Sequence, residues 1–342
     1  MFKDRIDRLF DAIAPDVNVV VLTQTNAVRY LTGSHEGMAV LRRGSVLLLT
    51  HRMVELAVKQ SGNPYRVVTR ENAKDVNREA FEGAIKIGYL EGQTTIPAQK
   101  DLKKRCGRKP LVDIGKALHD LAAIKDAGEI KLLRKACKIA SDTADRVPGM
   151  LKEGMTELEL LREINYVMAE LGAEGNTFGG IVGFGANTAH PHAVAEHRKL
   201  KKGQFVMVDY GASVGGYGSD ITRTYCFGKA SAKQKDTYAV CHETHLLSFE
   251  MTKDGKDGGE INKAVSELMV AKGYPEFCHS IGHGLGMIGG GFVNKPGAVN
   301  TIEPGIYIQG FGGVRIEDDI LIKEGGKFDL LTKSPRDVLI EV

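Results

Sequence analysis

The segment FVMVDYGASVGGYGSDITRTY, residues 205–225, decides how the rest of the chain is interpreted. Its first residues predict a strand that delivers Asp209 near its end, and residues 220–225 predict the returning strand. A hairpin of this length can direct Asp209 and Asp220 to a common point. Two carboxylates so close repel each other and raise one pKa unless a cation lies between them. The alternative is an Asx-turn at one aspartate and an ion pair with Arg223 at the other.

Three further side chains would extend this pair into a larger site. They are His283, between glycines in HSIGHGLG, Glu303, directly before Pro-Gly in TIEPGIYI, and Glu317, in GGVRIEDDILI. Glycines beside the histidine would let the backbone approach a ligand. Each side chain also has an ordinary alternative, which is a core histidine, a solvated glutamate before a turn and an acidic strand end.

Residues 312–322 are expected to form one strand that carries Glu317. Alternation along it places Arg315 and Glu317 on the face opposite Val314 and Ile316. Bringing the acidic run Glu-Asp-Asp toward a core without compensating charge would be costly. Four carboxylates and one imidazole that converge are better explained by divalent cations, for which Mn, Co or Fe suits these ligands at least as well as Zn. The number of ligands indicates two ions bridged by carboxylates, an arrangement that activates water.

The first third of the chain has a different pattern. Residues 1–124 alternate short apolar strands with helical stretches, which predicts an α/β domain. We expect strands at 19–23, 85–90 and 111–114, a hairpin over 40–50 that turns at Arg43–Gly44, and helices near 53–60, 97–105 and 116–123. No Ser/Gly/Pro-rich linker follows, so we place the boundary at 124–125 and expect residues 125–342 to form a second domain packed directly against the first.

The second domain contains a faint internal repeat. A long amphipathic helix is predicted from Asp126, with Pro148–Gly149 as its end. Further on, residues 151–172 and 252–273 share a Lys-acid-Gly opening, a helix-like run and a glycine at the same distance. Glycine at a helix end is ordinary, so the inference of a duplicated helix–sheet unit depends on the matching lengths. A shared site would then lie between the two halves.

Composition excludes several classes of protein. The chain has 342 residues, 42% of them hydrophobic and 26% charged, as in a folded globular protein. A net charge of +3 gives no reason to expect nucleic acid as a partner. No apolar run approaches the roughly 18 residues of a membrane span, and the first residues do not resemble a secretory signal. Five scattered cysteines, none in a CxxC, argue against disulfides or a thiolate zinc site and indicate a cytoplasmic location.

Four of these motifs together resemble one known family. VDYGASVGGYGSDITRTYCFG, HSIGHGLG, IEPGIYI and GVRIEDDILI occur in the order and spacing of the M24 metallopeptidases. The resemblance is strongest to the Xaa-Pro dipeptidase (prolidase) and aminopeptidase P branch. NTAHPHAVAEHRKLKKGQFVMVDYG resembles the segment before the first aspartate of that branch, and NAVRYLTGS (26–34) and AAIKDAGEIKLLRKACKIA (122–140) resemble its earlier parts.

The resemblance implies a fold and a set of functional residues. A creatinase-type α/β domain would occupy residues 1–124, and a pita-bread α/β catalytic domain with pseudo-twofold halves would occupy 125–342. Two divalent metal ions (Mn, Co, Fe or Zn) would be held by five residues, which are Asp209, Asp220, His283, Glu303 and Glu317.

The same resemblance assigns roles to other side chains near the metals. Glu303 would also carry a proton from water to the leaving nitrogen. His192, in AHPH, would contact the substrate and steady the tetrahedral intermediate, although by itself it is only a loop histidine. His279 matches a further histidine near the site. Arg315 would contribute to substrate binding by tying down a carboxylate beside the last ligand.

One position departs from the family pattern. A second histidine, in a His-Glu pair, usually follows seven residues after the His283 position, and here Gly290 occupies that place. That histidine donates to the substrate carbonyl, and the loss of one such donor typically costs on the order of 10²–10³ in rate. His279, Asn294 or a water would replace it, or the substrate differs, or turnover is poor.

The expected function is metal-dependent hydrolysis of the peptide bond before proline in a small peptide. Three alternatives remain, which are a creatinase-like hydrolase of another amide or C–N bond, a methionine aminopeptidase, and a binding protein on the same scaffold. Retention of all the metal ligands argues against the first, and methionine aminopeptidases lack such an N-terminal domain. The family resemblance further implies a homodimer, without membrane or nucleic-acid partners.

Overall fold

The computed structural model describes residues 2–50, 66–69 and 80–342 of the chain. These residues belong to two compact units, Met1–Ala122 and Ala123–Val342. The expected helix near 53–60 lies outside the described residues.

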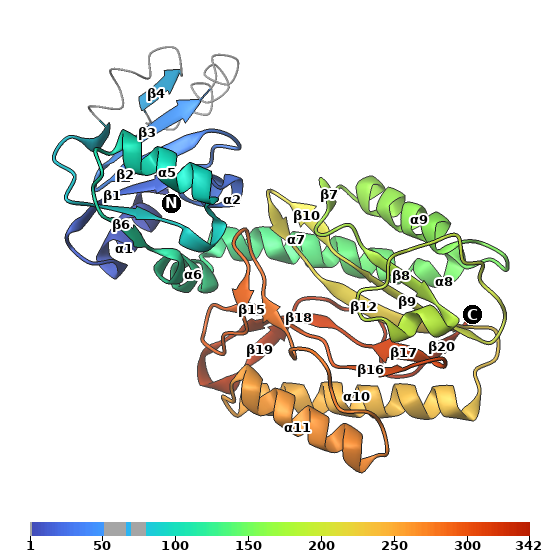
Figure 1. The fold of residues 1–342 in the computed structure, drawn as a ribbon. Coiled ribbons are helices and arrows are strands. Elements are labelled where there is room, and N and C mark those ends of the chain that lie inside the picture. Colours follow the sequence, from blue (N-terminus) through green and yellow to red (C-terminus); the bar gives the residue numbers. More distant parts are fainter. Residues whose placement is uncertain (1, 51–65, 70–79) are drawn as a thin grey trace. The chain divides into compact units, whose positions relative to one another are not determined.

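The N-terminal unit contains a six-stranded sheet (Figure 1). Its strands are β1 (Val17–Leu22), β2 (Met38–Arg42), β3 (Ser45–Thr50), β4 (Arg66–Thr69), β5 (Lys86–Tyr89) and β6 (Leu111–Asp113). They lie in the order β4-β3-β2-β1-β5-β6. The helices described in this unit are α1 (Phe2–Ala12), α2 (Thr25–Thr32), α5 (Ile96–Arg105) and α6 (Gly115–Ala123), with the 3-10 helix η2 (Glu91–Gln93).

The expected elements of this unit are confirmed wherever the structure describes them. Strands β2 and β3 pair antiparallel with Arg42 opposite Ser45, so the hairpin turns at Arg43–Gly44. Gly44 has a φ of 73°, a left-handed conformation that glycine adopts without strain. The remaining strands and the helices α5 and α6 lie within two residues of their expected ranges.

The C-terminal unit is built from helices on two sides of several sheets (Figure 1). Its helices are α7 (Ala127–Ala144), α8 (Val147–Met150), α9 (Glu157–Glu170), α10 (Ala232–Lys253) and α11 (Gly258–Ala271), with the 3-10 helices η3 (Gly185–Ala189) and η4 (Glu324–Gly326). Helices α7, α8 and α9 lie along one side of the strands, and α10 and α11 lie along the other. Of the helices in the described parts of the chain, none combines the length and apolar character needed to cross a bilayer.

Two larger sheets provide the framework of this unit. The first has the order β20-β12-β9-β8, and the second β14-β13-β15-β18-β19. The strands of the first are β8 (Ile181–Phe184), β9 (Gln204–Tyr210), β12 (Ile221–Phe227) and β20 (Ile340–Glu341). Those of the second are β13 (His283–Gly284), β14 (Gly290–Gly291), β15 (Val299–Ile302), β18 (Asp318–Ile322) and β19 (Phe328–Leu330). Smaller sheets are formed by β7 (Gly175–Asn176), β10 (Ala212–Val214) and β11 (Tyr217–Gly218), and by β16 (Gly305–Ile308) and β17 (Gly312–Arg315).

Helices α9 and α11 bear out the internal repeat. Each has 14 residues and begins with a capping box, formed by Thr156 with Glu159 and by Asp257 with Glu260. In a capping box the two residues satisfy backbone N–H groups of the first helical turn reciprocally. Since the two helices occupy equivalent positions in the two similar segments, the local sequence signals produce the same structure twice.

Two local expectations for this unit were wrong. Residues 312–322 form two strands in different sheets, because β17 pairs with β16 whereas β18 pairs with β15 and β19. The chain changes sheets at Ile316–Glu317, so Glu317 lies in the short connection between the two strands. The amphipathic helix ends at Ala144, and Pro148 lies in the first turn of the separate helix α8. Proline is tolerated there because the first N–H groups of a helix have no partner within the helix.

Candidate metal centre

The antiparallel pairing of β9 and β12 brings Asp209 and Asp220 together. Asp209 lies opposite Thr222 in this pairing, and Asp220 directly precedes β12. The two strands approach each other very closely just beyond Asp209, where a Cβ atom on Gly211 would lie 1.8 Å from the carbonyl oxygen of Ser219. Glycine is therefore required at this position, and the predicted hairpin is confirmed.

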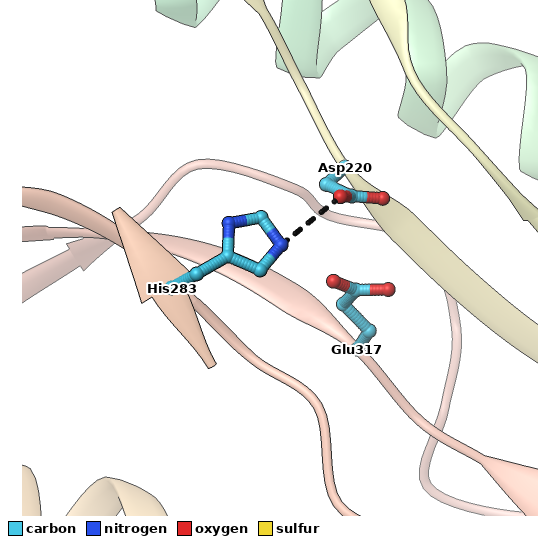
Figure 2. Close-up of side chains that lie close together, drawn as sticks. All are labelled: Asp220, His283 and Glu317. Atoms are coloured by element: carbon cyan, nitrogen blue, oxygen red, sulfur yellow. Dashed lines mark ion pairs between the residues drawn. The ribbon is translucent and has the colours of Figure 1, made fainter. Parts of the chain in front are cut away.

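His283, Glu303 and Glu317 reach the same place from the second half of the unit. His283 begins β13, Glu303 lies between β15 and β16, and Glu317 lies between β17 and β18. Atoms of Asp220, His283 and Glu317 lie within 4.8 Å of one another (Figure 2). His283 Nε2 lies 3.5 Å from Asp220 Oδ2 and 3.6 Å from Glu303 Oε1.

These side chains line one pocket of about 480 Å³. All the residues expected at the site from the sequence contribute to its wall, namely His192, Asp209, Asp220, His279, His283, Glu303, Arg315 and Glu317. Gly289 also lines the pocket, whereas Gly290 is exposed and is not part of the wall. Apolar surface is supplied by Phe178, Ile181, Pro191 and Leu285. The volume is that of a site for a small molecule.

The carboxylates of this pocket are electrostatically unfavourable to one another. Burial raises the pKa of Asp220 well above its ordinary value, and repulsion by Glu317 adds to the shift. Burial also raises the pKa of Glu317 well above its ordinary value, and repulsion by Glu303 adds to that shift. Burial also raises the pKa of Glu303. Such carboxylates are stabilised either by protons or by a bound cation.

Two buried carboxylate oxygens indicate that the pocket suits a bound cation. Asp209 Oδ1 and Asp220 Oδ1 have no hydrogen-bond partner among the described residues. A buried, unpaired carboxylate oxygen is costly unless a ligand completes it. Together with the imidazole, the oxygens form a donor set that fits divalent cations of the first transition series. The cluster is thus chemically suited to hold metal.

Arg315 holds one candidate ligand, and Thr222 links it to a second. The Arg315 guanidinium donates from Nη2 to Asp209 Oδ2 and from Nε to Thr222 Oγ1 at 2.9 Å. The Thr222 hydroxyl in turn donates to Glu317 Oε2 at 2.6 Å. Arg315 Nη1 donates to Tyr307 Oη at 2.8 Å and to the Pro191 carbonyl at 3.1 Å. Since four of its five N–H groups donate to acceptors of the protein, Arg315 holds Asp209 and Thr222 in fixed positions.

Hydrogen bonds also hold the ring of His279 in place. Its Nδ1 lies 2.9 Å from the carbonyl oxygen of Ser280, which can only accept, so Nδ1 carries the proton. Its Nε2 therefore accepts from the hydroxyl of Tyr307, 2.9 Å away. Burial lowers the pKa of His279 to about 4, so the ring is neutral at neutral pH. In this arrangement both ring nitrogens are engaged by the protein.

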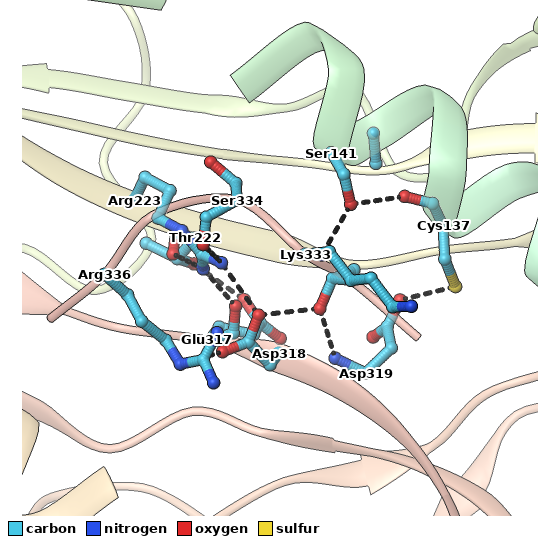
Figure 3. A network of polar contacts seen from close by, with 12 residues as sticks. Cys137, Ser141, Thr222, Arg223, Glu317, Asp318, Asp319, Lys333, Ser334 and Arg336 are labelled. Carbon is cyan, nitrogen blue, oxygen red and sulfur yellow. Dashed lines mark hydrogen bonds and ion pairs between the residues drawn. The ribbon is translucent and has the colours of Figure 1, made fainter. Parts of the chain in front are cut away.

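A buried network of charged side chains, formed by Arg223, Asp318 and Arg336, contacts the backbone of Glu317 (Figure 3). Arg223 Nη1 donates to the backbone carbonyl of Glu317 at 2.7 Å, and Nη2 donates to Asp318 Oδ1 at 2.8 Å. Arg336 Nε lies 3.1 Å from Asp318 Oδ2. Arg223 was expected only as a partner of the hairpin aspartates, but it pairs with Asp318, the first residue of β18.

Asp319 supports the other side of the cluster. Its Oδ2 accepts from the thiol of Cys137 at 3.2 Å (Figure 3). The same oxygen accepts from the backbone N–H of Asp220 at 3.0 Å. Burial raises the pKa of Asp319 to about 8. The acidic run Glu317-Asp318-Asp319 was visible in the sequence, but the roles of its last two members were missed, since Arg223 and Asp220, which they contact, lie almost a hundred residues away.

Comparison with known proteins agrees with this geometry. The model of metallopeptidase family M24 matches residues 131–324. An Xaa-Pro dipeptidase from Pyrococcus furiosus is 33% identical over 349 residues, covering 99% of this chain and 97% of the relative. The solved structure of an Xaa-Pro dipeptidase from Bacillus anthracis is similar with a TM-score of 0.92 and 30% identity, covering all of both chains. That of an X-Pro aminopeptidase from Thermotoga maritima has a TM-score of 0.89 and 26% identity, covering 98% of this chain and 99% of that one.

These findings confirm the resemblance and the expected α/β fold with its pita-bread catalytic domain. Membership in the family implies the use of divalent metal, for which the clustered carboxylates and imidazole are suited. The chain, whose family model covers more than half of its length, is a metallopeptidase and belongs to metallopeptidase family M24.

Proposed function

We propose that this protein hydrolyses the peptide bond before proline in small peptides, with metal-activated water as the nucleophile. The observation that carries the proposal is the convergence of Asp220, His283 and Glu317 in one pocket. Relatives named Xaa-Pro dipeptidase or X-Pro aminopeptidase support the choice of substrate.

Five residues would hold two divalent ions, and they are Asp209, Asp220, His283, Glu303 and Glu317. When bound, the ions supply Lewis acidity and lower the pKa of water. Glu303 is the proposed proton carrier. Its carboxylate lines the pocket together with His283 and Asp220, within reach of a water and of the leaving nitrogen of a bound peptide.

The neighbouring side chains would orient the substrate. His192 lines the pocket and is the proposed donor to the scissile carbonyl oxygen. His279 would act as a positioning residue, because its Nε2 accepts from Tyr307 and Tyr307 in turn accepts from Arg315. The apolar surface of Phe178 and Ile181 would accommodate the proline ring, whose tertiary amide has no N–H to satisfy.

We expect the absence of a histidine at position 290 to change the rate of the proposed reaction more than the type of reaction. Asn294 is not a good substitute for the absent histidine, since its side-chain amide donates to the carbonyls of Thr252 and Lys256. We therefore propose that His192 donates to the scissile carbonyl without a second imidazole, and that metal held by the five candidate ligands would supply Lewis acidity there. We further propose a cytoplasmic homodimer whose residues 1–124 form the creatinase-type domain and residues 125–342 the catalytic domain.

The test combines metal analysis with a panel of peptides. We expect purified protein to contain about two divalent ions per chain and to cleave Ala-Pro or Ala-Pro-Ala but not Ala-Ala. Replacement Asp220→Asn should abolish metal-dependent cleavage, whereas Asp254→Asn, an exposed residue directly after α10 that does not line the pocket, should leave it intact. Metal binding without cleavage of any Xaa-Pro peptide would overturn the proposal in favour of a binding protein.

A further inference from the structure

A basic hollow of about 1010 Å³ opens on the N-terminal unit, apart from the residues that form the candidate metal centre. Of the described residues that line it, five are cationic, and they are Lys100, Lys103, Lys104, Arg108 and Lys109. Glu91 is the one acidic residue in that same described lining. The whole chain has a net charge of only +3, so positive charge is strongly concentrated here.

The local fold brings these cations together from three places. Lys100 lies within α5, Lys103 and Lys104 lie in its last turn, and Arg108 and Lys109 follow in the connection to β6. The connection folds back onto the helix, because the N–H of Arg108 donates to the carbonyl of Lys103 at 2.8 Å. Arg108 adopts a φ of 61° to do so, and it is the sole non-glycine residue with positive φ in the described parts of the chain. Such a left-handed conformation is unfavourable for a residue that carries a Cβ.

Helix electrostatics explains only part of this arrangement. Cations in the last turn of a helix interact favourably with its dipole, which accounts for Lys103 and Lys104. Lys100 lies earlier in the helix, and Arg108 and Lys109 lie beyond it. Within the described residues, none of the five cations forms an ion pair with a carboxylate, whereas the neighbouring Arg105 pairs with Asp101 at 2.7 Å and does not line the hollow.

The floor of the hollow is polar and already satisfied. Gln99 Nε2 donates to Tyr89 Oη at 2.6 Å, and Tyr89 Oη donates to Glu91 Oε1 at 2.9 Å. Tyr89 is only 4% exposed, so its ring offers no surface on which a base could stack. Binding of single-stranded nucleic acid usually depends on such stacking. A compact anion that several cations can surround fits the hollow better than a polymer.

We propose that this hollow binds a small molecule bearing two or more phosphate groups. Lysine ammonium and arginine guanidinium groups both bind phosphate oxygens through charge-assisted hydrogen bonds. The volume is at the upper end of the range for small-molecule sites. The inference concerns a site separate from the proposed peptidase chemistry and does not depend on it.

Isothermal titration of the full-length, metal-loaded protein with inorganic tripolyphosphate tests the proposal. We expect one binding event per chain that weakens as salt is raised, since the interaction is electrostatic. The double variant Lys103→Gln/Lys104→Gln should bind at least tenfold more weakly. The matched control Lys131→Gln/Lys135→Gln removes two exposed lysines from α7 and should bind like the wild type. Since tripolyphosphate also chelates metal, any heat from the metal centre is common to both double variants.

Three results would overturn the proposal. They are the absence of binding at millimolar tripolyphosphate in low salt, equal weakening in both double variants, and tighter binding of a single-stranded oligonucleotide that the Lys103→Gln/Lys104→Gln change abolishes. Thermal unfolding of each variant identifies a change that merely destabilises the fold. If Lys103→Gln/Lys104→Gln proves unstable, Lys100→Gln/Lys109→Gln provides the same test, with one change earlier in α5 and one in the connection to β6.

Discussion

Replacement of Thr222 by valine should weaken both the fold and the metal centre. The Thr222 hydroxyl donates to Glu317 Oε2 at 2.6 Å and accepts from Arg315 Nε at 2.9 Å. All three residues are buried. Valine has nearly the same shape as threonine, so the change removes two hydrogen bonds without creating a cavity.

The magnitude follows from the charges of the two partners. A hydrogen bond to a charged group typically contributes about 1.5–3 kcal/mol. Loss of both should therefore lower the free energy of unfolding by about 3 kcal/mol or more. Side chains that orient a metal ligand usually change metal affinity by about 10–100-fold, and we expect the Kd for Mn²⁺ to rise within that range.

Thr222→Ser is the matched control, because it keeps the hydroxyl and loses only a methyl group. Urea denaturation in the presence of chelator measures stability without metal, and calorimetric titration with Mn²⁺ measures affinity. We expect the serine variant to resemble the wild type in both. If the valine variant also does so, the hydrogen-bonded chain from Arg315 to Glu317 does not position the proposed ligand.

Three other perturbations follow from the same structure. Burial lowers the pKa of His245 to about 3. In the unfolded chain the imidazole of His245 has its ordinary pKa of about 6.5 and binds a proton as pH falls below that value, whereas in the folded state it stays neutral. The free energy of unfolding should therefore decrease by about 2 kcal/mol between pH 7 and pH 5 because of this residue. Urea denaturation at both pH values should show that the loss is smaller in His245→Gln and unchanged in His35→Gln, an exposed control; equal pH dependence in all three proteins would refute it. Gly290→His should raise kcat for an Xaa-Pro peptide at least tenfold if the donor is missing, because one oxyanion donor is worth on the order of 10²–10³; an unchanged kcat would mean that another group already supplies it. Removal of metal with chelator should lower Tm and re-addition of Mn²⁺ should restore it, since binding to the folded state at about 100 times Kd stabilises by about 2.7 kcal/mol; a Tm that does not respond would argue against a metal centre.

Most of the framework around the site could be predicted from the sequence. The hairpin that carries Asp209 and Asp220 depends on alternation and on glycines, both of which are local signals. The helices α9 and α11 likewise follow from their capping residues and their closing glycines. Motif order then allowed the five candidate ligands to be named, although it could not say how they are held.

Other features depend on contacts between distant parts of the chain. Arg223 pairs with Asp318, in a segment where the chain leaves one sheet for another at Ile316–Glu317, and the pairing of whole strands decides where such a change occurs. The proton on His279 is placed by Ser280 and Tyr307, so its chemistry is set by the folded surroundings. By itself the sequence determined which side chains are available and where local structure begins and ends. Only the tertiary structure decided which charges meet, because burial and pairing act between residues that only folding brings into contact.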